Sequence, residues 1–262
     1  MSATLILRAD VGAVAVVILN DPAKLNALST PMLNALATEF EALAADPAVR
    51  VVVIRAMGKA FCAGHDLKEI QAARQAPDGG AAAFGDLFSL CSRIMQQIAS
   101  LPKPVIAEVQ GIATAAGCQL AATCDMVVAS DHARFGVNGV NIGLFCSTPI
   151  VALSRKIPQG TAFELAATGE FLSATRAQTL GLANRVTSAE DLSAQTMTLA
   201  QTLAQKLPAA LSIGKAAFAA QTGLPLDQAY AAAGSAMVDN LLNSDTSEGI
   251  TAFLEKRPPN WA

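Results

Sequence analysis

The spacing of apolar residues predicts strands that alternate with helices up to about residue 155. Strand-length apolar runs occupy residues 5–7, 13–19, 51–55, 105–109 and 126–129. The first two runs flank the turn sequence Asp10-Val11-Gly12 and predict a hairpin. The run from Val51 to Arg55 is rich in β-branched residues, which is typical of a buried strand in a parallel sheet. The first half of the chain is therefore predicted to be an α/β structure.

Apolar residues at helical spacing separate these runs. One such segment starts at Thr30-Pro31, where proline in the first turn favours a helix start. Its apolar positions are Met32, Leu33, Leu36, Phe40 and Leu43. A second amphipathic helix is marked by Leu87, Leu90, Ile94 and Ile98, and ends before Pro102 and Pro104. A third, made of small residues, lies between the strands at 105–109 and 126–129.

Beyond residue 155 the apolar spacing is helical throughout. It recurs at residues 161–168, 174–180, 189–206, 208–221, 226–242 and 246–256. We therefore expect an α/β core at residues 1–200, followed by a helical C-terminal region at residues 201–262. The segment from Gln75 to Ala83 contains Pro77, Gly79 and Gly80, and we expect it to be a mobile loop.

Composition narrows the class of protein. The chain has 262 residues, 52% of them hydrophobic and only 15% charged, with a net charge of −3. Its Lys and Arg residues are scattered, so we expect neither a nucleic-acid partner nor a membrane-binding patch. The longest apolar runs have the length of strands and do not predict a membrane span. Because the chain is so apolar, we expect part of its apolar surface to be buried at interfaces between subunits.

Cysteine and histidine usage argues against a metal site. The five cysteines are odd in number and lack a zinc-ligand spacing, and only His65 and His132 are present. We expect five buried, reduced thiols and no metal. The N-terminal residues up to Asp10 lack the basic and apolar regions of a secretory signal and the arginines of a transit peptide. A cytoplasmic location is the expectation from these features.

Three segments carry residues suited to chemistry. Asn20–Leu28 taken alone is a turn with a helix cap. Gly58–Glu69 follows a strand, and its Ala63-Gly64 allows backbone amides to face a pocket. Gly111–Asp125 follows another strand and opens a helix with small residues. Two loops that present free amides, one of them at a helix N-terminus, can form an oxyanion hole for a thioester carbonyl.

In their order and spacing these segments resemble the crotonase, or enoyl-CoA hydratase/isomerase, superfamily. The resemblance also includes residues 133–136, 168–170, 177–182 and 248–257. It implies the crotonase (ClpP-like) fold of ββα spiral repeats with a helical C-terminal region, and acyl-CoA chemistry in fatty acid metabolism. A narrower set of motifs, including Ala63–Glu69 and Gly139–Pro149, is similar to the group named enoyl-CoA hydratase domain-containing protein 3. Composition and periodicity alone indicate only an α/β enzyme-like domain.

The resemblance also implies a site. Its oxyanion hole would consist of the His65 and Ala116 amides, and CoA would be bound as part of the substrate, with no other cofactor. The residues implied to contact CoA are Lys24, Leu25, Ala63, Asp66, Leu67 and Lys68, joined by Phe253 and Lys256 from a neighbouring subunit. The implied assembly is a homotrimer or a dimer of trimers, built by the C-terminal helices.

Two positions depart from the hydratase pattern. Hydration in this family uses two glutamates to hold a water and deliver its proton. The matching positions here are Gln119 and Gly139. The side-chain amide of glutamine cannot exchange a proton near pH 7, and glycine has no side chain that could. General acid–base catalysis raises a reaction rate by about 10²–10⁴-fold. We therefore expect only weak hydratase activity.

Cys146 leaves an alternative open. In the naphthoyl-CoA synthase branch a glycine also replaces the second glutamate, and an Asp just downstream does chemistry; here that position is Cys146. Its thiol could act as a nucleophile or an acid, or be a small buried apolar group. The His65 imidazole could carry a proton, whereas Asp66 and Asp125 are expected to be structural. Thioester hydrolysis, decarboxylation, C–C cleavage and non-catalytic acyl-CoA binding remain alternative functions.

Overall fold

The computed structural model describes residues 4–261, and its core is built on two sheets. The larger sheet has the order β1-β2-β3-β5-β7-β10. Its strands are β1 Ile6–Val11, β2 Val14–Leu19, β3 Val51–Ala56, β5 Val105–Val109, β7 Met126–Ser130 and β10 Arg185–Thr187. Only β1 is antiparallel to its neighbour; the other pairs of this sheet are parallel. The first three residues of the N-terminal segment considered for a leader lie outside the described part.

The smaller sheet has the order β4-β6-β8-β9. Its strands are β4 Ala60–Cys62, β6 Ile112–Thr114, β8 Arg134–Gly136 and β9 Phe171–Ser173. Each of β3, β5 and β7 in the larger sheet is followed by one strand of the smaller sheet and then by a helix. The chain thus repeats a ββα unit, which confirms the predicted α/β class and its repeat.

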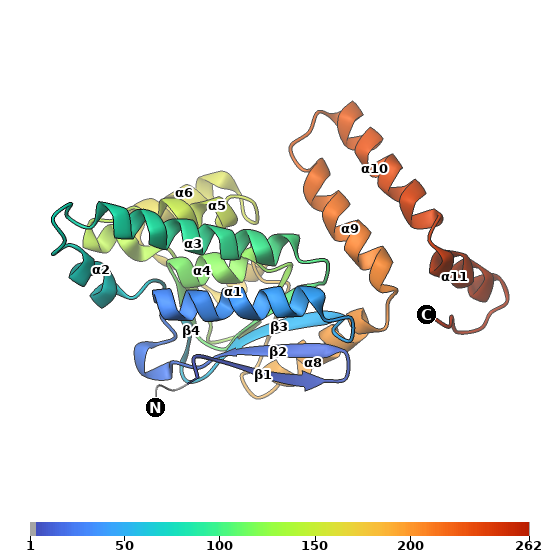
Figure 1. The fold of residues 1–262 in the computed structure, drawn as a ribbon, viewed down its shortest axis with the longest axis horizontal. Helices are drawn as coiled ribbons and strands as arrows, with labels where there is room; N and C mark the ends of the chain where they lie inside the picture. The colour runs from blue at the N-terminus through green and yellow to red at the C-terminus, as the bar shows by residue number, and fades with distance from the viewer. Residues whose placement is uncertain (1–3, 262) are drawn as a thin grey trace.

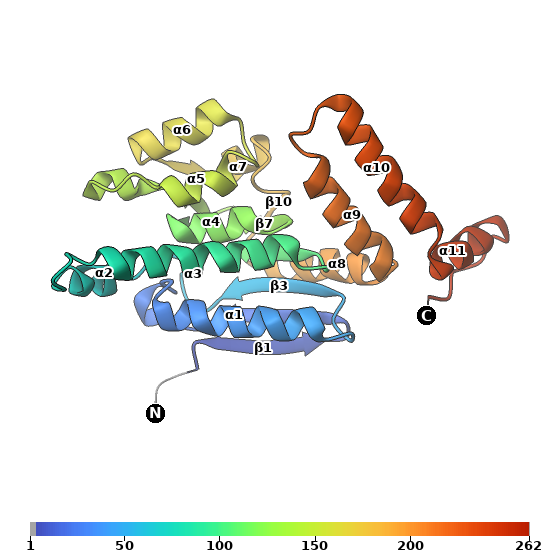
Figure 2. The same cartoon turned by 45° about the horizontal axis from the view of Figure 1, so that its top comes forward.

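Helices cover both faces of the larger sheet (Figures 1 and 2). The helices of the core are α1 Thr30–Ala45, α2 Leu67–Ala73, α3 Ala81–Ser100, α4 Ala116–Thr123, α5 Ser147–Leu153, α6 Gln159–Thr168, α7 Ala174–Thr179 and α8 Leu192–Ala204. Alternate residues of β2 and β3 contribute to two separate apolar clusters. The smaller cluster includes Leu192, Leu199 and Ala200 of α8, so α8 closes the face opposite α1, α3 and α4.

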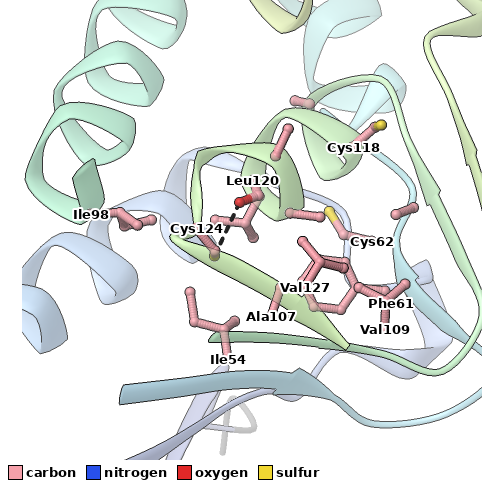
Figure 3. Packing of buried hydrophobic residues seen from close by; sticks show 14 of the residues in the cluster. Ile54, Phe61, Cys62, Ile98, Ala107, Val109, Cys118, Leu120, Cys124 and Val127 are labelled. Carbon is pink, nitrogen blue, oxygen red and sulfur yellow. Dashed lines mark hydrogen bonds between the residues drawn. The ribbon is translucent and has the colours of Figure 1, made fainter. Parts of the chain in front are cut away.

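The larger apolar cluster lies between the sheet and α4. Figure 3 shows Ile54 of β3, Ala107 of β5 and Val127 of β7 close to Leu120 of α4. The Cys124 thiol donates a hydrogen bond to the Leu120 carbonyl oxygen at 3.3 Å. This packing fixes the position of α4 on the sheet. The loop that leads into α4 is one of the two loops that the sequence predicts to form the site.

The C-terminal helices form an arm beside the core (Figure 2). They are α9 Pro208–Gln221, α10 Leu226–Leu241 and α11 Ser244–Leu254, and no residue of α9 or α10 is buried. Lys215 of α9 joins the arm to the core: its ammonium donates to the carbonyls of Ile98 and Lys103 and lies 2.7 Å from the Asp125 carboxylate. The arm is held at its base and presents apolar faces along its length.

Three expectations differ from the structure. The chain beyond residue 155 is not purely helical, because β9 and β10 each add a strand of three residues, too short for an alternating pattern to register. The first strand extends to Val11 instead of ending near Leu7, because β1 is a mostly exposed edge strand that tolerates Arg8 and Asp10. Helix α3 begins at Ala81, inside the expected mobile loop. The division at residue 200 into an α/β core and a C-terminal region stays a prediction; residue 200 itself lies in α8.

Candidate functional site

The two small-residue loops meet at Gly64. This glycine has φ +90°, and a Cβ built on it would lie 2.8 Å from Ala115 Cβ and 3.2 Å from the Ala116 backbone nitrogen. A Cβ on Gly117 would collide with the Cys62 carbonyl oxygen. Only glycine permits either approach. The structure therefore brings His65 and Ala116 to adjacent positions on two loops that are far apart in sequence.

The His65 and Ala116 amides have the hydrogen-bonding state that an oxyanion hole requires. Within residues 4–261 neither N–H donates to a protein acceptor, whereas the neighbouring Ala115 N–H donates to the Gly136 carbonyl at 2.9 Å. Ala116 is the first residue of α4, where the helix dipole favours a developing negative charge. Ala115, the residue before it, has φ 49° and ψ −123°, a strained conformation for alanine of the kind found at functional sites.

The His65 side chain is fixed on one side. Its Nδ1 lies 3.1 Å from the Leu28 carbonyl oxygen, which can only accept, so Nδ1 carries the proton. Its ring meets Phe88 of α3 edge to face, with 5.6 Å between ring centroids. Burial lowers the pKa of His65, and the Leu28 carbonyl and the Glu69 charge only partly oppose that shift. The ring is therefore neutral near pH 7, and its Nε2, buried without a partner, carries a lone pair.

The positions of the two family glutamates differ in the space they offer. Gln119 lies in α4 with only 5% of its surface exposed, and its Oε1 is buried without a hydrogen-bond partner. Gly139 has no room for a side chain: a Cβ there would lie 2.8 Å from Cys146 Sγ and collide with the Leu144 carbonyl oxygen. The site therefore contains one buried amide and no acid at these positions.

Cys146 is packed against the same glycine. It precedes the first turn of α5, only 6% of its surface is exposed, and its sulfur accepts the Gly139 N–H. Burial raises the pKa of its thiol, and this hydrogen bond opposes the rise only in part. The protonated thiol is thus the stable form near pH 7, which favours the packing role for Cys146 over the nucleophilic one.

The other four cysteines match the expectation of reduced, packed thiols. All five cysteines are free and buried. Burial raises the pKa of Cys62, Cys118 and Cys124 to about 12 and that of Cys91 to about 11.

Within residues 4–261 no group of three His, Cys, Asp or Glu side chains could hold a metal ion. No helix in that part of the chain is long and apolar enough to cross a bilayer.

Six of the proposed CoA contacts gather around the start of α2. They are Lys24, Leu25, Ala63, Asp66, Leu67 and Lys68. The Ala63 N–H donates to the Leu25 carbonyl at 3.0 Å, and Lys24 Nζ lies 3.2 Å from Asp66 Oδ2. Asp66 caps α2 by accepting the Lys68 and Glu69 amides. Burial acts to raise the pKa of Asp66, but Lys24 and these amides lower it overall. Asp66 therefore has the structural role expected for it.

Phe253 and Lys256 are not part of this group. Phe253 lies in α11 and Lys256 comes just after it, and α11 is at the opposite end of the molecule from α2 in both views (Figures 1 and 2). Phe253 is 82% exposed. Their place in the CoA site of a neighbouring subunit stays a prediction.

Two residues that shape the site were missed from the sequence. Asn26 is fully buried, and its amide donates to the Met57 and Ala60 carbonyls, which holds the left-handed turn at Leu25 and Asn26. Phe88 lies beside His65 but outside the apolar stripe of α3. The sequence signal for Asn26 is weak, namely an asparagine, a residue type that tolerates the left-handed backbone region, within the Asn20–Leu28 segment. Nothing in the sequence marks Phe88.

Comparison with known proteins identifies the family. A sequence model described as enoyl-CoA hydratase/isomerase matches residues 10–262. The chain belongs to the enoyl-CoA hydratase/isomerase family. The crystal structure of enoyl-CoA hydratase from Mycobacterium smegmatis superposes with a TM-score of 0.94 at 48% identity, covering 99% of each chain. This confirms the crotonase fold predicted from the sequence.

The narrower resemblance is confirmed as well. Enoyl-CoA hydratase domain-containing protein 3, mitochondrial, from Danio rerio is 44% identical, over 100% of this chain and 89% of the relative. The crystal structure of the human protein of that name has a TM-score of 0.93 at 41% identity, covering 98% of this chain and 100% of its own.

These names also correct one expectation. Four vertebrate relatives, at 43–44% identity, are called mitochondrial, which contradicts the cytoplasmic location inferred from the N-terminal residues. That expectation rested on the N-terminal residues and on the five cysteines expected to be reduced. A short N-terminal composition is thus a poor guide to the compartment of a chain in this family.

Proposed function

We propose that this protein binds an acyl-CoA thioester and polarises its carbonyl with the His65 and Ala116 amides. The observation that carries the proposal has two parts. The two loops touch at Gly64, and neither amide donates to a protein acceptor in the part of the chain that the structure describes. Two preorganised donors stabilise negative charge on a thioester oxygen in the transition state. The nucleotide and pantetheine parts of CoA would lie along Lys24, Leu25 and the start of α2, where Lys24 and Lys68 are exposed.

Hydration of an enoyl-CoA would be slow on this site. Gln119 offers an amide where the family has an acid, and the space at Gly139 is already filled by Leu144 and Cys146. The reaction would therefore be another acyl-CoA conversion aided by the oxyanion hole, with no metal or redox cofactor. Thioester hydrolysis, decarboxylation and C–C cleavage remain alternatives, as does binding without turnover. Their use of Cys146 as a nucleophile is disfavoured by the raised pKa of its thiol.

A trimer or a dimer of trimers would complete the site. The arm exposes large apolar side chains along α9, α10 and α11, among them Phe218, Leu242 and Phe253 at 74%, 80% and 82% exposure. Patches of this kind mark interaction surfaces. In the proposed assembly they pack between subunits, and Phe253 and Lys256 reach the CoA site of a neighbour. Light scattering is expected to give a mass that is a multiple of three; a monomer at micromolar concentration contradicts the assembly.

Calorimetry with a matched pair of ligands tests the proposed function. Butyryl-CoA has the thioester carbonyl, and the S-butyl thioether of CoA lacks it while keeping the rest. The proposal predicts that both bind and that the thioester binds about tenfold more tightly, as two modest net hydrogen bonds would give. Equal affinity for the thioester and the thioether would contradict the proposal that the two amides bind the carbonyl oxygen. No binding of either ligand would remove acyl-CoA recognition altogether.

A further inference from the structure

We propose that the His65 imidazole is the catalytic base of this site and takes a proton from the α-carbon of the bound acyl-CoA. The inference rests on the proposed acyl-CoA binding and adds the group that moves the proton. It starts from a feature of one residue: within residues 4–261, His65 has a backbone N–H without a protein acceptor and an imidazole Nε2 without a hydrogen-bond partner.

The ring is held as a base requires. The Leu28 carbonyl accepts from Nδ1 at 3.1 Å and fixes the tautomer, and the edge-to-face contact with Phe88 fixes the plane of the ring. A histidine whose Nδ1–H is held by an oxygen acceptor leaves Nε2 free to receive a proton. The orientation therefore does not depend on a bound ligand.

Nε2 has no partner of its own in the protein. Among residues 4–261 only four buried side-chain polar atoms lack a hydrogen-bond partner, and two of them are His65 Nε2 and Gln119 Oε1. A buried acceptor without a donor destabilises a folded protein, because the lost hydrogen bond to water is not replaced. Half of these unsatisfied atoms belong to two residues that the sequence assigns to one site. In the proposal, a bound acyl-CoA is the partner of these two acceptors.

The other candidate groups near the site are committed elsewhere. Asp66 pairs with Lys24 and caps α2, and Glu69 accepts the Thr30 N–H at 2.9 Å. Cys146 keeps its proton because burial raises its pKa. No acid occupies positions 119 and 139. Of the groups on these loops, the imidazole of His65 is the one that is neutral, oriented and unsatisfied.

The proposed step balances without a further reactant. The α-carbon gives its proton to His65 Nε2, and the electron pair of the C–H bond forms the enolate of the thioester. The oxygen of that enolate is stabilised by the His65 and Ala116 amides. The imidazolium then returns a proton, or a deuteron in heavy water, to the α-carbon. The site would therefore serve acyl-CoA conversions that begin with proton abstraction next to the carbonyl.

Deuterium exchange tests the step in the intact protein. Butyryl-CoA in heavy water is incubated with the enzyme, and deuterium at the α-carbon is followed by mass spectrometry. The wild-type protein is expected to exchange, and His65→Phe to lower the rate by about 10²–10⁴-fold. Phenylalanine keeps the backbone amide and the ring contact with Phe88. His132→Ala is the matched control, since His132 is the other histidine and its side chain is exposed; it is expected to exchange as the wild type does.

Binding measured on the same samples separates the two proposals. If wild type and His65→Phe bind butyryl-CoA equally and only the wild type exchanges, the base is assigned. Added imidazole is expected to restore exchange to His65→Ala, which covers the case in which the phenylalanine variant fails to fold. If the wild type binds but does not exchange, or if His65→Phe exchanges at the wild-type rate, His65 is not the base although acyl-CoA recognition stands. Failure to bind would overturn the proposed function itself.

Discussion

Gly139 and Cys146 are in contact so close that position 139 cannot accept a side chain. A Cβ built on Gly139 would lie 2.8 Å from Cys146 Sγ, and the Leu144 carbonyl oxygen would be closer still. The departure from the family's second glutamate is therefore more than a change of residue type, because the loop before α5 has closed over the space. Restoring hydratase chemistry by placing a glutamate at 139 would require this loop to move.

Alanine at two glycines tests this relationship. Gly139→Ala is expected to lower the free energy of unfolding by about 1–3 kcal/mol, since the added methyl group must displace backbone. Gly85→Ala is the matched control: Gly85 is in α3, and nothing lies within 4 Å of a Cβ there. It is expected to raise stability by up to about 1 kcal/mol, because alanine favours a helix interior. Urea unfolding of both variants measures the difference. A neutral Gly139→Ala would show that the loop yields easily.

The second prediction concerns Cys146. Cys146→Ser keeps a group that can accept the Gly139 N–H and is expected to cost about 1 kcal/mol of stability. Acyl-CoA affinity and α-proton exchange are expected to stay near wild type, because the thiol is packed and protonated. Urea unfolding, calorimetry and the exchange assay measure the three quantities. A large loss of exchange with affinity unchanged would give Cys146 a catalytic role.

The third prediction concerns the attachment of the C-terminal arm. Lys215→Met removes an ammonium that binds Asp125 and the carbonyls of Ile98 and Lys103, and leaves these acceptors partly buried. The expected cost is about 1.5–3 kcal/mol. Hydrogen exchange of the α9 amides is expected to become faster. Lys59→Met, which changes an exposed lysine in the turn between β3 and β4, is expected to have neither effect. Unchanged protection of α9 would mean that other contacts hold the arm.

The fourth prediction is a pH dependence of stability that originates in His65. Burial lowers its pKa below the usual 6.5 in the folded state, so the unfolded chain binds more protons in the window just below pH 6.5. Stability from this group is complete above pH 6.5 and is lost as the pH falls toward the folded-state pKa. Glu69 is the charged group that opposes the shift; the facing Phe88 and Leu28 carry none.

Urea unfolding at several pH values between 5.5 and 7.5 measures that dependence. The difference in stability between wild type and His65→Phe is expected to shrink as the pH falls, since only the wild type must remain unprotonated at position 65. A difference that is constant with pH would show that the imidazole is not held neutral by its surroundings.

The sequence predicted which loops form the site, but not how residues 138–146 fill the space beside Gly139. Small residues at 63–64 and 115–117 indicated backbone amides facing a ligand, and the structure places those loops in contact through Gly64. Motif matching located Gln119 and Gly139, but it could not show that Leu144 fills the space beside Gly139. That contact depends on how the loop at 138–146 folds back, which is a tertiary effect without a local signal.

The fold shows the same division. Long, periodic segments such as α1 and α3 were predicted from their apolar spacing, and strands β2 and β3 were predicted from two apolar runs; their parallel pairing is seen only in the structure. The strands β9 and β10 were missed because three residues carry too little pattern. The sequence also could not show that His65 carries its proton on Nδ1 and its lone pair on Nε2. This tautomer depends on the carbonyl of Leu28, which is 37 residues away.

Hydration of crotonyl-CoA tests the central claim most directly, because it measures binding and acid–base chemistry on one ligand. Calorimetry with crotonyl-CoA and loss of its enoyl absorbance are measured on the same wild-type sample. The account predicts binding together with hydration at least about 10²-fold slower than an ordinary hydratase assayed alongside, since the acids are absent. Gln119→Glu is expected to raise the rate only in part, because the two family acids act as a unit. Wild-type hydration at the rate of the ordinary hydratase would contradict the account and mean that another residue delivers the proton.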